Sequence, residues 1–179
     1  MTAPKIYTRS GDDGTTGLFY GGRVRKDAPA PRAYGAIDEA QAALGLARAE
    51  ATRGGELDEL LVRLERDLYV CMAELATLPE NQAKLADRVT SEMVVALEPA
   101  IDDAMARFPM PTDFVIPGAT RVSALLDVAR TVVRRAERES LAVAADGSYV
   151  VAYLNRLSDL LWALARWQDG EDHLLAKDQ

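Results

Sequence analysis

Arg130, Arg134 and Arg138 stand four residues apart in a stretch whose apolar residues follow helical periodicity. Side chains at this spacing share one helix face, so three guanidinium groups are predicted to project in one row. A guanidinium is suited to bidentate binding of phosphate, which makes the row a candidate anion site. The structural alternative is a solvated face with the ion pairs Asp127–Arg130 and Arg134–Glu137, the commoner arrangement on an arbitrary helix. Because like charges four apart disfavour an isolated helix, the row favours an anion or a partner carboxylate.

Residues 7–17, with the sequence YTRSGDDGTTG, combine glycines, hydroxyl side chains and charges. Glycines allow backbone N–H groups to point inward around an anion, and hydroxyl groups add neutral donors. Lys26, nine residues beyond Gly17, can supply a point charge. The P-loop pattern GxxxxGK(S/T) is absent from the chain, and a plain turn-rich loop is the alternative interpretation. The length of the segment and its mixture of hydroxyl groups and cations favour anion binding.

Two further polar positions lie on segments that are predicted to be helical. Asn155 and Asp159 are one turn apart beside an apolar stripe. A buried asparagine needs hydrogen-bond partners, so Asn155 either caps a neighbouring backbone or binds a ligand. Asp38 lies in the first turn of a helix, where an acid is an ordinary partner of the helix dipole, and Gly35 beside it allows close approach. The structural and the functional interpretation both remain open for these residues.

The overall composition limits the classes of protein to which the chain can belong. With 179 residues, 49% hydrophobic and 27% charged, it is expected to form one soluble domain, residues 1–179. The net charge of −7 argues against nucleic-acid binding, which depends on an excess of cations. Residues 1–32 nevertheless carry six basic against three acidic side chains, which suggests a small anionic ligand.

One cysteine and one histidine exclude much ordinary active-site chemistry. Cys71 lies in an apolar helical stretch and is therefore predicted to be a buried inert thiol. As the single cysteine it forms neither an internal disulfide nor a cysteine cluster. His173 is predicted to belong to the tail, so a zinc site or a Ser-His-Asp triad is hard to build. No apolar run approaches the roughly 20 residues that span a bilayer, and no signal segment is recognised. A cytoplasmic protein without membrane or nucleic-acid partners is expected.

Helical periodicity covers most of the chain and predicts an all-α five-helix bundle over residues 32–167. Glycines and prolines exclude a helix in residues 1–31. No alternating strand pattern of useful length is present. Pro99 is expected to kink the third helix or to begin a fresh first turn. The predicted helices are 32–53, 56–78, 90–108, 120–144 and 149–167, followed by a polar tail, 168–179, that is expected to fray.

Six segments together resemble the PduO-type family of ATP:cob(I)alamin adenosyltransferases. In chain order they are KIYTRSGDDGTTGLF, RVRKD, YGAIDEAQAALGLARA, FVIPGAT, ARTVVRRAER and YLNRLSDLLWALAR, at the intervals that are usual in the family. Each segment alone is a weak signal, but six in order over residues 5–167 are highly specific. The resemblance implies a ferritin-like helical bundle that forms homotrimers and binds ATP and corrinoid at subunit interfaces.

The resemblance also implies roles for individual residues. Arg130 would pair with Asp38 of a neighbouring subunit, and both would support catalysis together with Arg134. Residues implied in ATP binding, mainly at its triphosphate, are Thr8, Arg9, Ser10, Gly11, Thr16, Gly17 and Lys26 from the loop and Arg134, Glu137, Arg138 and Asn155 from the last two helices.

The same resemblance implies a corrinoid site around one aromatic residue. Phe114 matches the family's aromatic that occupies the lower face of cobalamin and excludes its dimethylbenzimidazole ligand. Ala119 departs from the second glycine that relatives often carry after Pro117-Gly118, which is expected to stiffen this loop. Trp167 is a candidate for a second aromatic near the corrinoid.

The implied reaction needs no nucleophile from the protein. Cob(I)alamin attacks carbon 5′ of ATP by itself, so the protein supplies position and electrostatics, which suits a chain with one histidine and one cysteine. The implied ligands are ATP with Mg²⁺ and cobalamin as substrate, and a reductase and an adenosylcobalamin-dependent enzyme are implied as transient partners. Two alternatives are an ATP-responsive corrinoid carrier or sensor with little turnover, and a structural helical oligomer. The glycine-threonine loop, Lys26 and the arginine row favour the transferase.

Overall fold

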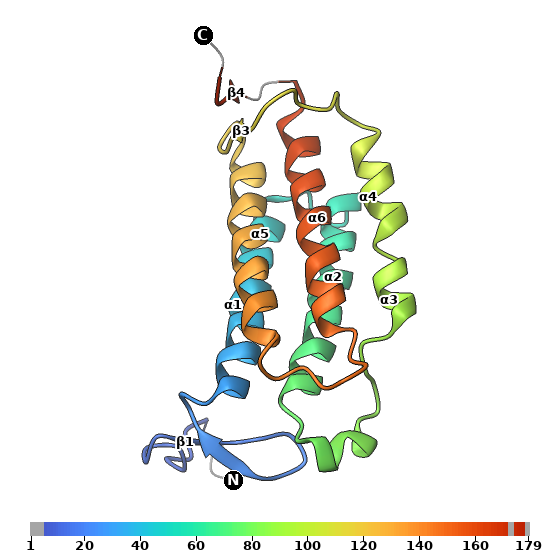
Figure 1. Ribbon diagram of the computed structural model, residues 1–179. Coiled ribbons are helices and arrows are strands. Elements are labelled where there is room, and N and C mark those ends of the chain that lie inside the picture. The colour runs from blue at the N-terminus through green and yellow to red at the C-terminus, as the bar shows by residue number, and fades with distance from the viewer. Residues whose placement is uncertain (1–5, 172–173, 178–179) are drawn as a thin grey trace.

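Long helices stand side by side, with short connections at both ends of the bundle (Figure 1). The computed structural model describes residues 6–171 and 174–177. The helices are α1 (Pro29–Glu50), α2 (Glu56–Leu75), α3 (Ser91–Val95), α4 (Glu98–Met105), α5 (Arg121–Ser140) and α6 (Val150–Asp169), and a 3-10 helix covers Pro79–Lys84. Because α3 and α4 follow one another along one edge, the predicted all-α five-helix bundle is confirmed.

Local chemistry explains where several helices begin. Helix α1 begins at Pro29, three residues earlier than predicted, because proline in a first turn loses no hydrogen bond. Thr120 and Ser123 form a reciprocal capping box at the start of α5. Pro99 lies in the first turn of α4, so the predicted third helix is divided in two. The predicted C-terminal ends of α1, α2 and α5 were three or four residues too late, since periodic patterns continue past the last helical turn.

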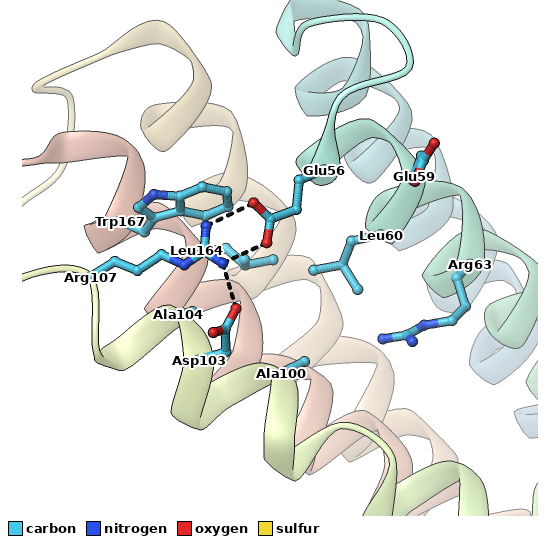
Figure 2. A pocket seen from close by; sticks show the side chains of 10 residues that line it. All are labelled: Glu56, Glu59, Leu60, Arg63, Ala100, Asp103, Ala104, Arg107, Leu164 and Trp167. Atoms are coloured by element: carbon cyan, nitrogen blue, oxygen red, sulfur yellow. Dashed lines mark hydrogen bonds and ion pairs between the residues drawn. The ribbon is translucent and has the colours of Figure 1, made fainter.

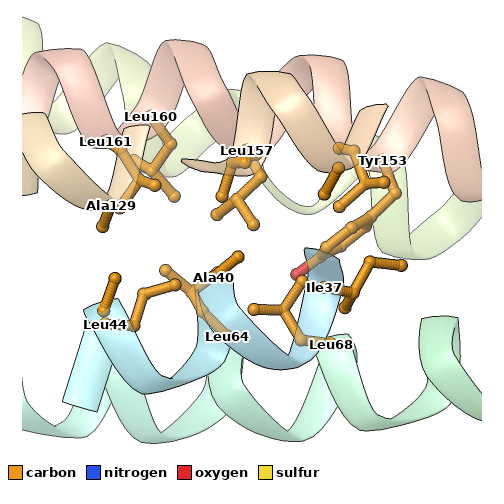
Figure 3. Packing of buried hydrophobic residues seen from close by; sticks show 14 of the residues in the cluster. Ile37, Ala40, Leu44, Leu64, Leu68, Ala129, Tyr153, Leu157, Leu160 and Leu161 are labelled. Atoms are coloured by element: carbon orange, nitrogen blue, oxygen red, sulfur yellow. The ribbon is translucent and has the colours of Figure 1, made fainter. Parts of the chain in front are cut away.

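The core lies between α1, α2, α5 and α6, where leucine side chains interdigitate (Figure 3). Leu44, Leu64 and Leu157 are wholly buried there. Helix α1 contributes mainly alanines, whose small side chains allow its backbone to pack closely against α5. Cys71 is buried as predicted, and burial raises the pKa of its thiol, which makes it a poor nucleophile.

Two small antiparallel sheets complete the fold, with strands too short for pattern recognition. The paired strands are β1 (Thr15–Gly17) with β2 (Arg23–Arg25), and β3 (Val115–Ile116) with β4 (Leu174–Leu175). The second sheet corrects the expectation of a frayed tail for residues 174–177, because β4 pairs with β3 and the Ala176 N–H donates to the Phe114 carbonyl at 2.8 Å. His173 lies outside the described residues. No helix in the described ranges combines the length and apolar character needed to cross a membrane.

Candidate functional site

The N-terminal loop is held together by Arg23, a residue that sequence analysis did not single out. Its Nη2 donates to the Ser10 carbonyl at 2.5 Å and to Oγ1 of Thr15 at 2.6 Å. Asp13 accepts from Oγ1 of Thr15 at 2.7 Å and from its N–H at 2.9 Å. These two bonds, together with nearby Arg23, hold the pKa of Asp13 below its ordinary value. Arg23 lies opposite Gly17 in the hairpin of β1 and β2, and no pattern in the sequence indicates this pairing.

Gly11 lies where the loop approaches the side chain of Lys26. A Cβ at Gly11 would be 3.0 Å from the Thr15 carbonyl oxygen and 3.2 Å from Nζ of Lys26, so the space admits only glycine without rearrangement. The hydroxyl groups of Thr8 and Ser10 are 2.8 Å apart. The structure therefore brings an ammonium group and two hydroxyl groups into the same exposed loop.

The other loop residues of the predicted site lie less close to one another than Gly11 and Lys26 do. The Arg9 guanidinium lies 5.7 Å from the Tyr7 ring centroid. Thr16 pairs with Val24 in the hairpin of β1 and β2, and Gly17 with Arg23. Lys26 is tied to the loop through its backbone, because its N–H donates to the Gly14 carbonyl at 2.9 Å.

The arginine row is only partly explained by ion pairs within the chain. Arg130 donates from Nε to Oδ1 of Asp127 at 3.1 Å, which matches one of the two ion pairs of the structural alternative. Arg138 donates to the Arg134 carbonyl at 2.9 Å. Within the described ranges, the exposed Arg134 guanidinium makes no hydrogen bond or ion pair. A guanidinium without a carboxylate on an acidic protein is available to an anion.

Glu137 contacts Asn155 rather than Arg134. The Asn155 side-chain amide donates to Oε1 of Glu137 at 3.1 Å, and this contact joins α5 to α6. Asn155 itself is exposed at this contact. Asp38 is exposed on α1, while its neighbour Glu39 forms an ion pair with Arg135 that lowers the pKa of Glu39. The pairing of Arg130 with Asp38 of a neighbouring subunit stays a prediction.

Phe114 lies at the opposite end of the bundle, beside β4, and is 84% exposed. It borders a hollow of about 660 Å³ between its own segment, α5 and α6. Residues that line the hollow include Phe114, Asp127, Arg130, Trp162, Arg166 and Lys177. Ala119 is not in the left-handed backbone region, which Gly118 alone enters here, so alanine is accommodated without strain.

Trp167 does not line the hollow beside Phe114, whereas Trp162 does. Trp167 faces a separate groove of about 500 Å³ between α2, α4 and α6, shown in Figure 2. There the Arg107 guanidinium lies 4.4 Å from the Trp167 ring centroid and binds Glu56 and Asp103. Trp162 and Trp167 face different hollows because five residues along a helix turn a side chain to another face. The position of Trp167 near a bound corrinoid stays a prediction.

The two candidate half-sites lie at opposite ends of the subunit. The β1 hairpin and its loop are below the first turn of α1, whereas β3 and β4 are at the far end (Figure 1). The 20 residues of α5 that separate these ends span about 30 Å at the rise of an α-helix. The protein is therefore a helical bundle with a cationic loop at one end and a partly apolar hollow at the other. One chain by itself does not bring these two half-sites together.

Comparison with known proteins places the chain in a family. A family model described as cobalamin adenosyltransferase matches residues 6–168. The corrinoid adenosyltransferase PduO of Citrobacter freundii is 43% identical over 94% of this chain and 51% of its own length. A second corrinoid adenosyltransferase of the same organism is 42% identical over 92% of this chain and 95% of its own length. This chain thus spans about half the length of the PduO relative and nearly all of the shorter one.

A solved structure agrees with the sequence comparisons. A phenylalanine-to-alanine variant of the PduO-type ATP:corrinoid adenosyltransferase from Lactobacillus reuteri, complexed with cobalamin and ATP, is 30% identical with a TM-score of 0.83. The match covers 92% of this chain and 93% of that one. The chain belongs to the cobalamin adenosyltransferase family, which confirms the resemblance found in the six sequence segments.

Proposed function

We propose that the chain transfers the 5′-deoxyadenosyl group of ATP to the cobalt of cob(I)alamin, itself reduced from cob(II)alamin, and releases triphosphate. The observation that carries the proposal is the Arg134 guanidinium, which has no partner in the described part of a chain that belongs to this family. Lys26 and the hydroxyl groups of the loop supply further donors for the triphosphate.

Two solved variants of the Lactobacillus reuteri protein support the roles that we assign to Phe114 and Arg134. One solved variant replaces a phenylalanine and is complexed with cobalamin and ATP, and another replaces an arginine by lysine and is complexed with ATP. The two substituted positions are 20 apart in that protein, as Phe114 and Arg134 are here. We infer that Phe114 serves the corrinoid and Arg134 the nucleotide.

The proposed reaction is a nucleophilic displacement. The electron pair of Co(I) forms a bond to carbon 5′ while the bond from carbon 5′ to oxygen breaks. Triphosphate leaves with the electron pair of that broken carbon–oxygen bond, and the cobalt becomes Co(III). The leaving group gains charge as the bond breaks, so cationic donors that are already in place stabilise the transition state. Lys26, Arg134 and Arg138 are the proposed donors. Phe114 would occupy the lower face of the corrinoid and exclude its dimethylbenzimidazole ligand, which makes Co(II) easier to reduce.

A complete site is proposed to form between subunits. The loop and the Phe114 hollow lie at opposite ends of one chain, so contact between a neighbour's loop and this hollow would unite them. We propose that the homotrimer implied by the resemblance supplies such contacts and that the exposed Asp38 binds Arg130 of the next subunit.

Further ligands and partners remain part of this proposal. In the described ranges, no cluster of three or more His, Cys, Asp or Glu side chains is placed to hold a metal ion. Mg²⁺ is therefore proposed to arrive on the ATP phosphates and to keep most of its water ligands, as it does in many nucleotide sites. We also propose a reductase and an adenosylcobalamin-dependent enzyme as transient partners. A cytoplasmic location and a single domain of residues 1–179 are proposed as well.

One assay separates the transferase from a corrinoid carrier. The protein is mixed with ATP, Mg²⁺ and chemically reduced cobalamin, and the cobalamin spectrum is followed over time. Many equivalents of adenosylcobalamin per subunit are expected. Stoichiometric binding without further turnover would establish the carrier instead, and absence of any binding would exclude both functions.

A further inference from the structure

Four charged side chains form a chain of contacts at the hollow beside Phe114, and three of them, Asp127, Arg130 and Arg166, line it. Arg166 is 2% exposed and donates to Oδ2 of Asp127 and to Oδ2 of Asp169, each at 2.6 Å. Asp127 is 4% exposed and accepts from Nε of Arg130 with its other oxygen, at 3.1 Å. The three buried residues Asp127, Arg166 and Asp169 are called the inner network here. With Arg130 included, two positive charges balance two negative ones.

The inner network is not needed merely to fill space. Buried ion pairs lose hydration that their mutual attraction only partly restores, and apolar residues of the same volume often stabilise a protein as well. Asp169 even retains a buried Oδ1 that has no hydrogen-bond partner in the described structure. Asp127 and Arg166 both line the hollow, and so does Arg130. Their location at this hollow therefore points to a role in what the hollow binds.

Asp127 connects the buried Arg166 to the partly exposed Arg130. One of its oxygens is held by Arg166 from α6, and the other holds only the Nε of Arg130, three residues further along α5. The terminal nitrogens of Arg130 make no hydrogen bond in the described ranges, and its side chain is 27% exposed. The network thus holds the Nε of Arg130 and leaves its terminal donors without a hydrogen bond in the described ranges.

The same network fixes the aromatic wall of the hollow. The Arg166 guanidinium lies 5.8 Å from the Trp162 ring centroid, and the same ring system meets Phe108 edge to face at 6.1 Å between centroids. Because Arg166 also binds Asp127, it ties α6 to α5 at the height of the hollow. Loss of this tie would shift Trp162 and Arg130 together.

We propose that Asp127, Arg166 and Asp169 are positioning residues for the corrinoid half of the site, which set the orientation of Arg130 and the place of Trp162 without touching the reacting atoms. This inference rests on the proposed function, because it assumes that the hollow receives the corrinoid. The other charged pair at the hollow, Asp113 with Lys177 at 3.1 Å, makes no hydrogen bond or ion pair with the inner network in the described ranges.

The test compares Asp127→Asn with Asp58→Asn. Asparagine keeps the shape of aspartate but removes the charge that orients both arginines. Asp58 is a matched control, since it is 9% exposed and bound to Arg48 at 2.8 Å but does not line the hollow. Steady-state rates are measured against cob(I)alamin and against ATP, and corrinoid binding is followed by quenching of tryptophan emission in a Trp167→Phe background, which isolates Trp162.

Asp127→Asn is expected to raise KM and Kd for the corrinoid at least about tenfold, as small misplacements in a site do, while KM for ATP stays unchanged. Asp58→Asn should alter neither constant. An unchanged corrinoid KM, or equal increases for both substrates, would overturn the inference while the wild-type activity stands. If Asp127→Asn does not fold, Arg166→Lys is measured in its place under the same criteria. A wild-type protein that forms no adenosylcobalamin would instead refute the proposed function.

Discussion

Replacement of Gly11 by alanine tests whether the N-terminal loop binds the triphosphate. The new Cβ would lie 3.0 Å from the Thr15 carbonyl oxygen, which is held in β1, and 3.2 Å from Nζ of Lys26. Backbone in a paired strand does not yield easily, so residue 11 has to move away from Thr15, and the flexible Lys26 side chain is displaced as well. The helical core is remote from this exposed loop, and the variant is expected to fold normally.

The size of the effect follows from the contact that is lost. A hydrogen bond from an ammonium group to a phosphate contributes roughly 1.5–3 kcal/mol, which corresponds to about a ten- to hundredfold change in affinity. Gly11→Ala should therefore raise KM for ATP by at least about tenfold and leave KM for cob(I)alamin unchanged.

Initial rates of adenosylcobalamin formation are measured by the change in corrinoid absorbance, with thermal unfolding as a check of the fold. Gly45→Ala in α1 is the control, because its nearest neighbour would be Oε1 of Glu65 at an ordinary 3.6 Å. A folded Gly11→Ala protein with the wild-type KM for ATP would show that the loop and Lys26 do not bind the triphosphate.

Three further outcomes are expected. Arg134→Ala should lose most of its kcat/KM for ATP with no change in thermal stability, because the side chain has no partner in the described structure; unchanged efficiency would remove it from the site. Phe114→Ala should slow turnover from cob(II)alamin far more than from cob(I)alamin, and equal losses would contradict its role at the lower face. The Gly54 N–H and then Arg48 lower the pKa of Asp58 below 3.8, so its carboxylate stabilises the fold above that pH and this stabilisation is lost as the pH falls through the lowered value. Urea unfolding at several pH values should therefore show that Asp58→Asn is less stable than wild type near neutrality and that the difference narrows in acid.

Local patterns in the sequence determined the helices and much of the core. Ile37, Ala40, Leu44 and Ala47 recur at spacings of three and four in the predicted helix 32–53, and all four are buried. This succeeds because helical periodicity is a local property that assigns each residue to a face before any partner is known. The six segments also determined the family, since their order and intervals are carried by the chain itself.

The tertiary structure alone decided which side chains meet. Asp127 and Arg166 are 39 residues apart and bond inside the bundle, and nothing in either local pattern indicates the other. The packing of α6 also decided that Trp162 rather than Trp167 reaches the hollow, and that Asn155 stays exposed. Such contacts depend on how whole helices are rotated and placed against one another, which periodicity does not fix. The arginine row was therefore readable from the sequence, but the buried network behind Arg130 was not.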